Sequence, residues 1–212
     1  MSDFSDPGAA ARRLNELLVE AGQAELDSAT GAQFEVYFHL LMRWNARMNL
    51  TAVRDGEKVL SRHFVESIAC ARALPAGIAT LLDFGSGAGF PGLPIALCRP
   101  EIAVTLAESQ GKKAAFLREA VRTLGVRVEV HGARAEALER KFACVTLRAV
   151  DQMEAAVRVA AGLVGPGGRL AILTTEAESV EMRAAAGAGF AWGDQVALPG
   201  GESRILVMGN RG

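Results

Sequence analysis

Three glycines at alternate positions follow directly on a short apolar run, and they constrain the fold of this chain more than any other feature. Residues 81–94 read Leu-Leu-Asp-Phe-Gly-Ser-Gly-Ala-Gly-Phe-Pro-Gly-Leu-Pro, which places Gly85, Gly87 and Gly89 after the run. Glycine adopts backbone dihedrals that other residues avoid, and its missing Cβ lets a ligand approach the main chain. The pattern therefore predicts a strand that leads into a nucleotide-binding turn.

The spacing of these glycines indicates which nucleotide-type cofactor the turn would bind. A dinucleotide-binding turn has the spacing G-x-G-x-x-G, but Phe90 stands where its third glycine is expected. Asp83 before the glycines and Glu108 after a second apolar run supply acceptors at two strand ends. The ammonium and ribose hydroxyls of S-adenosylmethionine need such acceptors. We therefore favour this cofactor, and a nicotinamide oxidoreductase is kept as an alternative.

Short apolar runs alternate with helical stretches from residue 79 onward, which is typical of an α/β protein with a parallel sheet. The predicted strands are 80–84, 103–107, 126–130, 144–147 and 169–173, the last after a tight turn at 165–168, and the predicted helices are 91–98, 111–124, 152–163 and 176–187. Two runs around Pro199-Gly200-Gly201 predict an antiparallel hairpin at the end of the sheet.

Helical periodicity also marks the first part of the chain, at 8–22, 26–46 and about 56–73, where Asp27 or Ser28 is suited to cap the second helix. We therefore predict an N-terminal helical cap over residues 1–75 and a sheet-containing domain over residues 76–212. Together they form one compact unit.

Charge and cysteine content exclude several classes of protein. The 212 residues carry a formal net charge of −1, so the overall balance does not indicate a polyanionic partner. Three cysteines without a C-x-x-C pair argue against a disulfide framework or a metal site. No run approaches the roughly 18 apolar residues of a membrane span, and no basic-then-apolar leader is visible. These features predict a cytoplasmic protein.

A local excess of positive charge is nevertheless present between residues 43 and 63. It comprises Arg43, Arg47, Arg54, Lys58, Arg62 and His63. Such a patch can bind phosphate groups, and it can equally be a solvated helix face.

Polar residues that follow the predicted strands would meet at one edge of the sheet, where open α/β sheets bind ligands. They are Asp83 and Gly85 to Gly89, then Glu108, then Arg134 and Glu136, and finally Arg148. We expect Glu108 to accept from ribose hydroxyls, Ala135 and Glu136 to border an adenine, and Phe90 to supply an apolar wall. Arg148 has three open alternatives: a cofactor carboxylate, a substrate phosphate, or a structural pair with Glu136.

Several further motifs accompany the glycine turn. They are Asn45-x-Arg47-x-Asn49-Leu50-Thr51, Arg62-His63-x-x-x-Ser67, Lys112-Lys113, Arg134-Ala135-Glu136 and Arg148-Ala149. With residues 83–94 they closely resemble the small-subunit ribosomal RNA guanine-N7 methyltransferases, also called the glucose-inhibited division protein B family. The resemblance runs from about residue 10 to residue 208.

The resemblance implies a Rossmann-like class I S-adenosylmethionine-dependent methyltransferase, with a mostly parallel seven-stranded sheet. It implies that the chain methylates N7 of a guanine, 527 in the standard numbering, in 16S ribosomal RNA, either free or within the small ribosomal subunit. The resemblance implies cofactor contacts at Gly85, Phe90, Ala135, Glu136 and Arg148, and also at Glu108. The glycine turn itself adds Asp83 and Gly87, and Arg148 is also the candidate catalytic residue. The residues predicted to contact RNA are Arg47, Asn49, Arg62 and His63.

Two alternatives to this function are kept. One is a methyltransferase that acts on a small molecule or a protein. The other is a non-catalytic cofactor-binding module at the ribosome, which Thr174-Thr175 favours, because related sequences usually carry Lys-Gly there.

Overall fold

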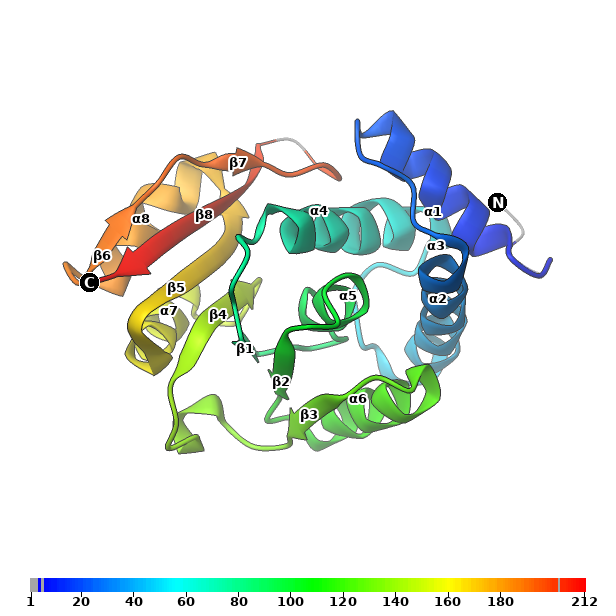
Figure 1. The fold of residues 1–212 in the computed structure, drawn as a ribbon. Helices are drawn as coiled ribbons and strands as arrows, with labels where there is room; N and C mark the ends of the chain where they lie inside the picture. The colour runs from blue at the N-terminus through cyan, green and yellow to red at the C-terminus, as the bar shows by residue number, and fades with distance from the viewer. Residues whose placement is uncertain (1–3, 5, 202) are drawn as a thin grey trace.

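One mixed β-sheet forms the centre of the molecule (Figure 1). The computed structural model describes residue 4, residues 6–201 and residues 203–212. Within these residues eight strands form the sheet, in the order β3-β2-β1-β4-β5-β8-β6, with β7 paired to β8 beside this path. Their bounds are β1 Thr80–Phe84, β2 Ala103–Ala107, β3 Val128–His131, β4 Phe142–Arg148, β5 Val164–Thr175, β6 Phe190–Trp192, β7 Val196–Ala197 and β8 Arg204–Arg211. The first five strands are parallel and β8 is antiparallel to its neighbours, which confirms the predicted α/β fold class. Over the described residues the sheet has eight strands where seven were predicted, because the short strand β6 adds to it.

The parallel registers bring the carboxyl ends of four strands to one edge of the sheet. Phe84 of β1 is level with Ala107 of β2 and with Leu147 of β4. Ala107 is in turn level with His131 of β3. The loops that follow these strands therefore begin side by side, as the sequence predicted for the ligand-binding edge.

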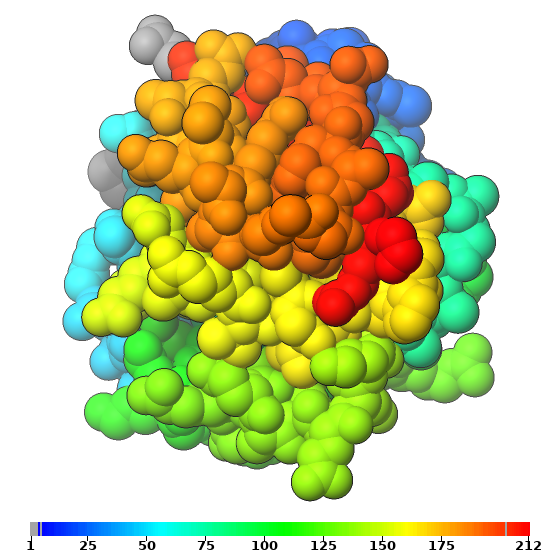
Figure 2. Space-filling view, turned by 90° about the vertical axis from the view of Figure 1, so that its left-hand side faces the viewer, coloured from blue at the N-terminus to red at the C-terminus, as the bar shows by residue number. Residues whose placement is uncertain are grey.

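Helices cover both faces of the sheet, because successive side chains of a strand point to opposite sides. Leu81 packs into a core shared with helices α1 to α6, whereas Leu82 packs with α7 and α8. The bounds are α1 Ala9–Glu20, α2 Ser28–Met48, α3 Gly56–Val59, α4 Glu66–Ala73, α5 Gly92–Cys98, α6 Gly111–Leu124, α7 Met153–Leu163 and α8 Glu176–Ala186. Figure 2 shows the end of the molecule farthest from α1 and α2, where the orange and red C-terminal segments lie over the yellow residues of α7 and β5.

The helical cap begins as the sequence predicted and shares its core with the sheet. Asp27 caps α2, since its side chain accepts a hydrogen bond from the Thr30 N–H at 2.9 Å. Phe34 and Phe64 of the cap belong to the same buried cluster as Leu93 and Leu106. Segments on both sides of residue 75 thus contribute to one core, while a domain boundary at that residue stays a prediction.

The segment predicted as one helix over 56–73 is divided in the structure. Between α3 and α4 the residues Leu60–Val65 form a π-helical segment, η1. A π-turn widens the helix by one residue, which apolar periodicity does not reveal, and such turns occur often at functional sites. His63 lies within this segment and Glu66 directly follows it, and both side chains contact Arg148.

Two other predictions at the level of elements were incomplete. The run at 165–168 lies within β5 instead of forming a turn before it, because Val164 pairs with Phe142 and Arg169 pairs with Cys144. The residues between them form an irregularity in the strand. The short strand β6 was not predicted, since three residues are too few for a periodic pattern.

Candidate active site

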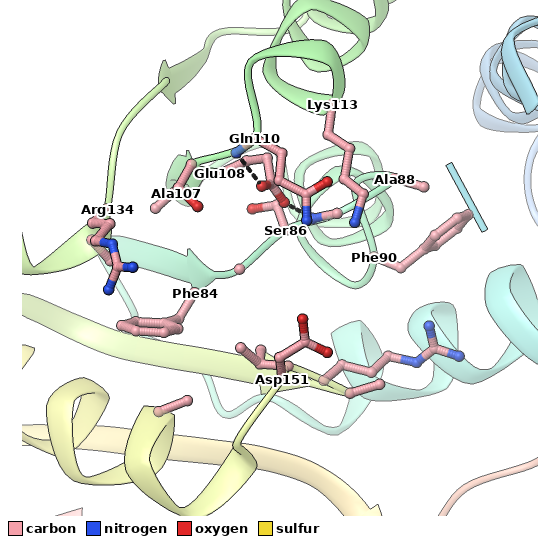
Figure 3. A pocket seen from close by; sticks show the side chains of 18 of the residues that line it. Phe84, Ser86, Ala88, Phe90, Ala107, Glu108, Gln110, Lys113, Arg134 and Asp151 are labelled. Atoms are coloured by element: carbon pink, nitrogen blue, oxygen red, sulfur yellow. Dashed lines mark hydrogen bonds between the residues drawn. The ribbon is translucent and has the colours of Figure 1, made fainter. Parts of the chain in front are cut away.

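A cleft of about 880 Å³ opens at the sheet edge where β1, β2 and β4 end (Figure 3). Its walls come from the loops after these strands, from the 3-10 turn η2 (Ala135–Ala137), and from residues 49–52 of the helical cap. Small-molecule sites span roughly 300 to 1000 Å³, so the volume suits a nucleoside-sized ligand. The structure thus brings the loops identified in the sequence to a single cleft.

The glycine loop after β1 has the backbone conformation that its sequence predicted. The φ angle is 70° at Gly85 and 95° at Gly89, in the region that other residues rarely adopt. A Cβ on Gly85 would lie 2.9 Å from Cγ2 of Val150, and one on Gly89 would lie 2.7 Å from Oη of Tyr37. The Tyr37 hydroxyl donates to the Ala88 carbonyl at 2.5 Å, so α2 of the cap fixes this loop directly.

Asp83 supports the glycine loop from a position outside the lining of the cleft. Its side chain is buried, with Oδ2 accepting from the Gly92 N–H and Oδ1 from the Thr146 hydroxyl, each at 3.1 Å. Burial raises the pKa of this carboxyl to about 6, although hydrogen bonds to it act in the opposite direction. The structure therefore places Asp83 beneath the glycine loop and outside the cleft lining, and its contact with a cofactor stays a prediction.

Glu108 lines the cleft and also closes the glycine loop. Its Oε2 accepts from the Gly87 N–H at 2.9 Å, and its Oε1 accepts from the Gln110 N–H at 2.7 Å. Each carboxylate oxygen has further lone pairs, so Glu108 can also accept hydrogen bonds from a ligand. Ala135 and Glu136 line the cleft as well, which places them where contacts to the same ligand were predicted.

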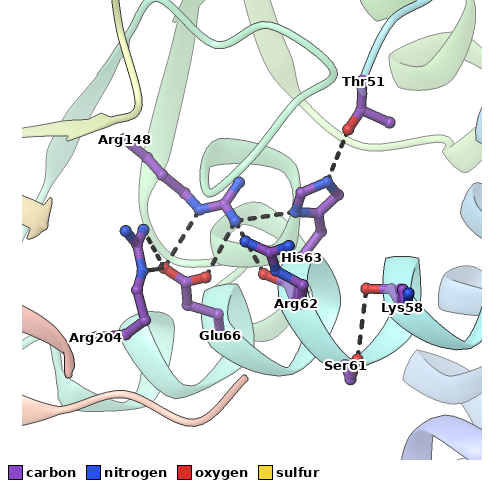
Figure 4. A network of polar contacts seen from close by, with 8 residues as sticks. All are labelled: Thr51, Lys58, Ser61, Arg62, His63, Glu66, Arg148 and Arg204. Atoms are coloured by element: carbon purple, nitrogen blue, oxygen red, sulfur yellow. Dashed lines mark hydrogen bonds and ion pairs between the residues drawn. The ribbon is translucent and has the colours of Figure 1, made fainter. Parts of the chain in front are cut away.

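Arg148, at the end of β4, is the centre of a polar network (Figure 4). Its Nη2 donates to Oε2 of Glu66 at 3.0 Å and to the carbonyl of Arg62 at 2.9 Å. Arg204 of β8 donates to the other oxygen of Glu66 at 2.9 Å. Burial raises the pKa of the Glu66 carboxyl, but the two arginines outweigh it and hold the pKa below its usual value. In the structure Arg148 pairs with Glu66, whereas a pair with Glu136 was one of the three alternatives that the sequence left open.

His63 lies between this network and the cleft. Its Nδ1 is 2.9 Å from Nη2 of Arg148, and its Nε2 is 2.9 Å from Oγ1 of Thr51. Burial and the charge of Arg148 lower the pKa of this imidazole to about 4. The ring also packs against Phe90, with the ring centroids 5.1 Å apart. The lowered pKa indicates a neutral imidazole near pH 7, which is a weaker base than an exposed histidine.

The residues predicted to contact RNA divide into two groups. Asn49 and His63 line the cleft, whereas Arg47 and Arg62 are exposed and do not line it. Asn49 ends α2 with a φ of 48°, and its side chain accepts a hydrogen bond from Arg54. The structure thus separates a cleft group from an exposed basic group.

Residues that sequence reasoning did not single out include several that line the cleft, among them Gln110, Val150 and Asp151, and three that hold the site together. Tyr37 holds the glycine loop, Glu66 pairs with Arg148, and Thr51 contacts His63. Nothing in the sequence marks Tyr37 or Glu66, because each stands in an ordinary amphipathic helix pattern. Thr51 belongs to the Asn-Leu-Thr motif, so the sequence does contain a signal for this residue.

Two features are absent from the part of the chain that the structure describes. Within residues 4, 6–201 and 203–212, no group of three or more His, Cys, Asp or Glu side chains is arranged to hold a metal ion. Across that same part of the chain, no helix combines the length and apolar character that crossing a membrane requires.

Comparison with known families gives one consistent match. Residues 30–194 match the family model described as GidB, rRNA small subunit methyltransferase G. A ribosomal RNA small subunit methyltransferase G of Halorhodospira halophila is 46% identical over 167 residues, which cover 78% of this chain and 79% of the relative. The protein with the same description from Xanthomonas euvesicatoria is 40% identical over 190 residues, covering 86% of this chain and 88% of the relative.

Solved structures with the same fold are methyltransferases of lower sequence identity. The mitomycin 7-O-methyltransferase MmcR has a TM-score of 0.64 at 17% identity, covering 99% of this chain and 70% of its own. A SAM-dependent methyltransferase from Aquifex aeolicus has a TM-score of 0.57 at 18% identity, covering 73% of this chain and 93% of its own. At these identities the likeness shows the fold alone, which is that of class I methyltransferases.

Proposed function

Since the chain belongs to the GidB family of rRNA small subunit methyltransferase G proteins, as its motifs predicted, we propose that it transfers a methyl group from S-adenosylmethionine to N7 of one guanine in 16S ribosomal RNA. The family match supports ribosomal RNA as the substrate, and the weakly basic imidazole of His63 in the cleft agrees with a target atom that carries no proton. Guanine N7 has a free lone pair and no proton, so its methylation needs no general base. Such a substrate places the activity in the cytoplasm, on the small ribosomal subunit or an assembly intermediate of it.

The residues of the cleft fit the cofactor. Gly85 and Gly87 present main chain without side chains, Glu108 offers carboxylate lone pairs for ribose hydroxyls, and Ala135 with Glu136 borders the adenine. Nη1 of Arg148 makes no hydrogen bond to any of the described residues 4, 6–201 and 203–212, and Arg148 lines the cleft. That nitrogen is available for the carboxylate of the cofactor.

The chemistry requires placement more than acid or base groups. When bound, S-adenosylmethionine supplies a methyl carbon that N7 attacks with its lone pair, while the carbon–sulfur electron pair returns to sulfur and no proton moves. The chain's part is to hold the base in line with that carbon, and such positioning contributes roughly 7 to 11 kcal/mol. The purine becomes cationic in this step, which a neutral His63 favours over an imidazolium.

The exposed basic residues of the cap provide contacts to the RNA backbone. Arg47, Lys58 and Arg62 are exposed, and Lys113 lines the cleft. A surface of this kind positions RNA through phosphates, while selection of the base comes from the cleft.

The proposal is tested with small ribosomal subunits purified from a strain that lacks this protein. Incubation with the pure protein and methyl-labelled cofactor should modify one guanine, which N7-selective strand cleavage locates. Naked 16S rRNA, assayed in parallel, shows whether the folded particle is required. Label that enters only ribosomal protein or a small molecule would overturn the RNA assignment. No incorporation, with normal cofactor binding, would favour the non-catalytic alternative.

A further inference from the structure

The Asn-Leu-Thr motif holds a hydroxyl group whose hydrogen-bonding direction is fixed by its neighbours. Oγ1 of Thr51 is 2.9 Å from Nε2 of His63 and also accepts from the Val53 N–H at 3.2 Å. Thr51 lines the cleft together with His63 and Phe90. What the hydroxyl can do for a ligand depends on which hydrogen bonds it accepts and which it donates.

The tautomer of His63 follows from its partner on the other side. Nδ1 of His63 lies 2.9 Å from Nη2 of Arg148, which carries two hydrogens and no free lone pair, so a hydrogen on Nδ1 would face another hydrogen. Of the two neutral tautomers, only the one with an unprotonated Nδ1 suits this contact, in which Nη2 shares its two hydrogens among Glu66, the Arg62 carbonyl and His63. The imidazole proton is then on Nε2, and Nε2 donates to Thr51. Glu66, which is 2% exposed, holds Arg148 in this position and fixes the direction of the chain of hydrogen bonds shown in Figure 4.

This arrangement leaves the Thr51 hydroxyl with only its hydrogen to offer. A hydroxyl oxygen has two acceptor lone pairs, and the N–H groups of His63 and Val53 occupy both. No residue among 4, 6–201 and 203–212 accepts the hydroxyl hydrogen. The group is therefore an obligate donor at the wall of the cleft.

The backbone around Thr51 is held rigidly, so the donor is preorganised. The buried side chain of Asn45 accepts from the Thr51 N–H at 2.9 Å and donates to the Val53 carbonyl at 3.0 Å. Both ends of the three-residue segment are thereby fixed to α2. A donor held in this way discriminates between ligands that place an acceptor or a donor opposite it.

We propose, on the basis of the proposed function, that the Thr51 hydroxyl donates a hydrogen bond to O6 of the target guanine and so selects guanine over adenine. Guanine presents N7 and O6 as adjacent acceptors, whereas adenine presents N7 beside an amino group that donates. Against adenine the obligate donor would face a second donor. Thr51 is thus a specificity residue that touches the substrate, and His63 and Arg148 are its positioning residues.

The test is a double-mutant cycle between the protein and the base. Small subunits are reconstituted with 16S rRNA that carries either guanine or 2-aminopurine, which lacks O6, at the methylated position. The quantity compared is the ratio of kcat/KM on the guanine substrate to kcat/KM on the 2-aminopurine substrate. We expect this ratio to be roughly 5- to 15-fold larger for the wild type than for Thr51→Val, because the variant has already lost the hydrogen bond to O6. Subunit affinity, measured by filter binding, should show the same non-additivity.

Matched variants separate the hydroxyl from packing. Thr51→Ser keeps the hydroxyl and should keep the wild-type ratio of guanine to 2-aminopurine rates. His63→Gln retains an N–H for Thr51 and should keep the ratio, whereas His63→Leu should lower it. Wild-type protein that treats both bases equally would overturn the proposal without any variant, even if Thr51→Val did not fold.

Two other outcomes are distinguishable. If Thr51→Val slows both substrates by the same factor and weakens cofactor binding in calorimetry, the hydroxyl contacts the cofactor and the proposal is wrong. If wild-type protein produces no N7-methylated guanine on natural subunits, the proposed function itself has failed, independently of Thr51.

Discussion

Two carboxylates of the site have different surroundings although each lies at the carboxyl end of a strand, Asp83 within β1 and Glu108 directly after β2. Asp83 turns inward against α5 and β4, and Glu108 turns outward to the cleft. The sequence placed both at strand ends, but the direction of each side chain depends on the register of neighbouring strands. A residue's place along the chain was predictable here, while its orientation required the tertiary structure.

Glu108→Ala should weaken cofactor binding. The substitution removes acceptors for the ribose and leaves the N–H groups of Gly87 and Gln110 without their carboxylate partner. We expect a loss of about 1 to 3 kcal/mol in the binding free energy of S-adenosylmethionine, measured by calorimetry. Glu139→Ala, at an exposed glutamate outside the cleft, is the control. Equal dissociation constants for Glu108→Ala and wild type would refute this role.

His63 should make the folded protein less stable as the pH falls. Its pKa is about 4 in the folded state and about 6.5 when exposed, so between these values the unfolded chain binds more protons. Above about pH 6.5 the lowered pKa of His63 makes its whole contribution to the free energy of unfolding. This contribution is lost as the pH falls from 6.5 toward 4, so the folded protein becomes less stable. His63→Gln lacks this titration.

Urea unfolding of the wild type and of His63→Gln at pH 7 and pH 4.5 measures this contribution. The stability of the wild type relative to the variant should decrease by about 2 kcal/mol at the lower pH. The raised pKa of Asp83 acts in the opposite direction, but it is present in both proteins and cancels. A difference that stays constant between the two pH values would contradict the buried neutral imidazole.

At the scale of elements, periodicity predicted most of the helices and the parallel strands, because each buries one regular face. The predicted helix at 111–124 and strand at 80–84 match α6 and β1. Periodicity did not reveal the π-helical segment η1, from which His63 contacts Arg148. It also missed β6, a three-residue strand that pairs with β8 at the edge of the sheet.

The first residues of α5 and α6 are both glycines, and they should respond differently to alanine. A Cβ on Gly92 would lie 2.3 Å from Cδ2 of Leu106 and 2.6 Å from Oδ2 of Asp83, whereas nothing lies within 4 Å of one on Gly111. Gly92→Ala should therefore lower the free energy of unfolding by about 2 to 3 kcal/mol through overpacking. Gly111→Ala should leave it unchanged or raise it by up to about 1 kcal/mol. Denaturant titration compares the pair, and equal values would show that α5 moves freely to make room.

At the scale of the molecule, the cap and the sheet are tied together at the active site. Tyr37 of α2 fixes the glycine loop, and Glu66 of α4 joins Arg148 of β4 to Arg204 of β8. The sequence predicted both parts but not these links, because each joins residues that are far apart along the chain. A cleft formed in this way depends on the cap being folded.

The cap and the sheet should therefore unfold in one transition, and the two tryptophans of the chain allow this to be measured. Trp44 lies in α2 against Phe116 of α6, and Trp192 lies in β6 at the other end of the molecule. In Trp192→Phe the fluorescence reports the cap, and in Trp44→Phe it reports the sheet edge. For each variant, the urea midpoint measured by fluorescence should equal the midpoint measured by circular dichroism. If the Trp44 signal changed at a lower urea concentration than the circular dichroism, the cap would be a separately unfolding domain, and contacts such as that between Tyr37 and Ala88 would contribute little to its stability.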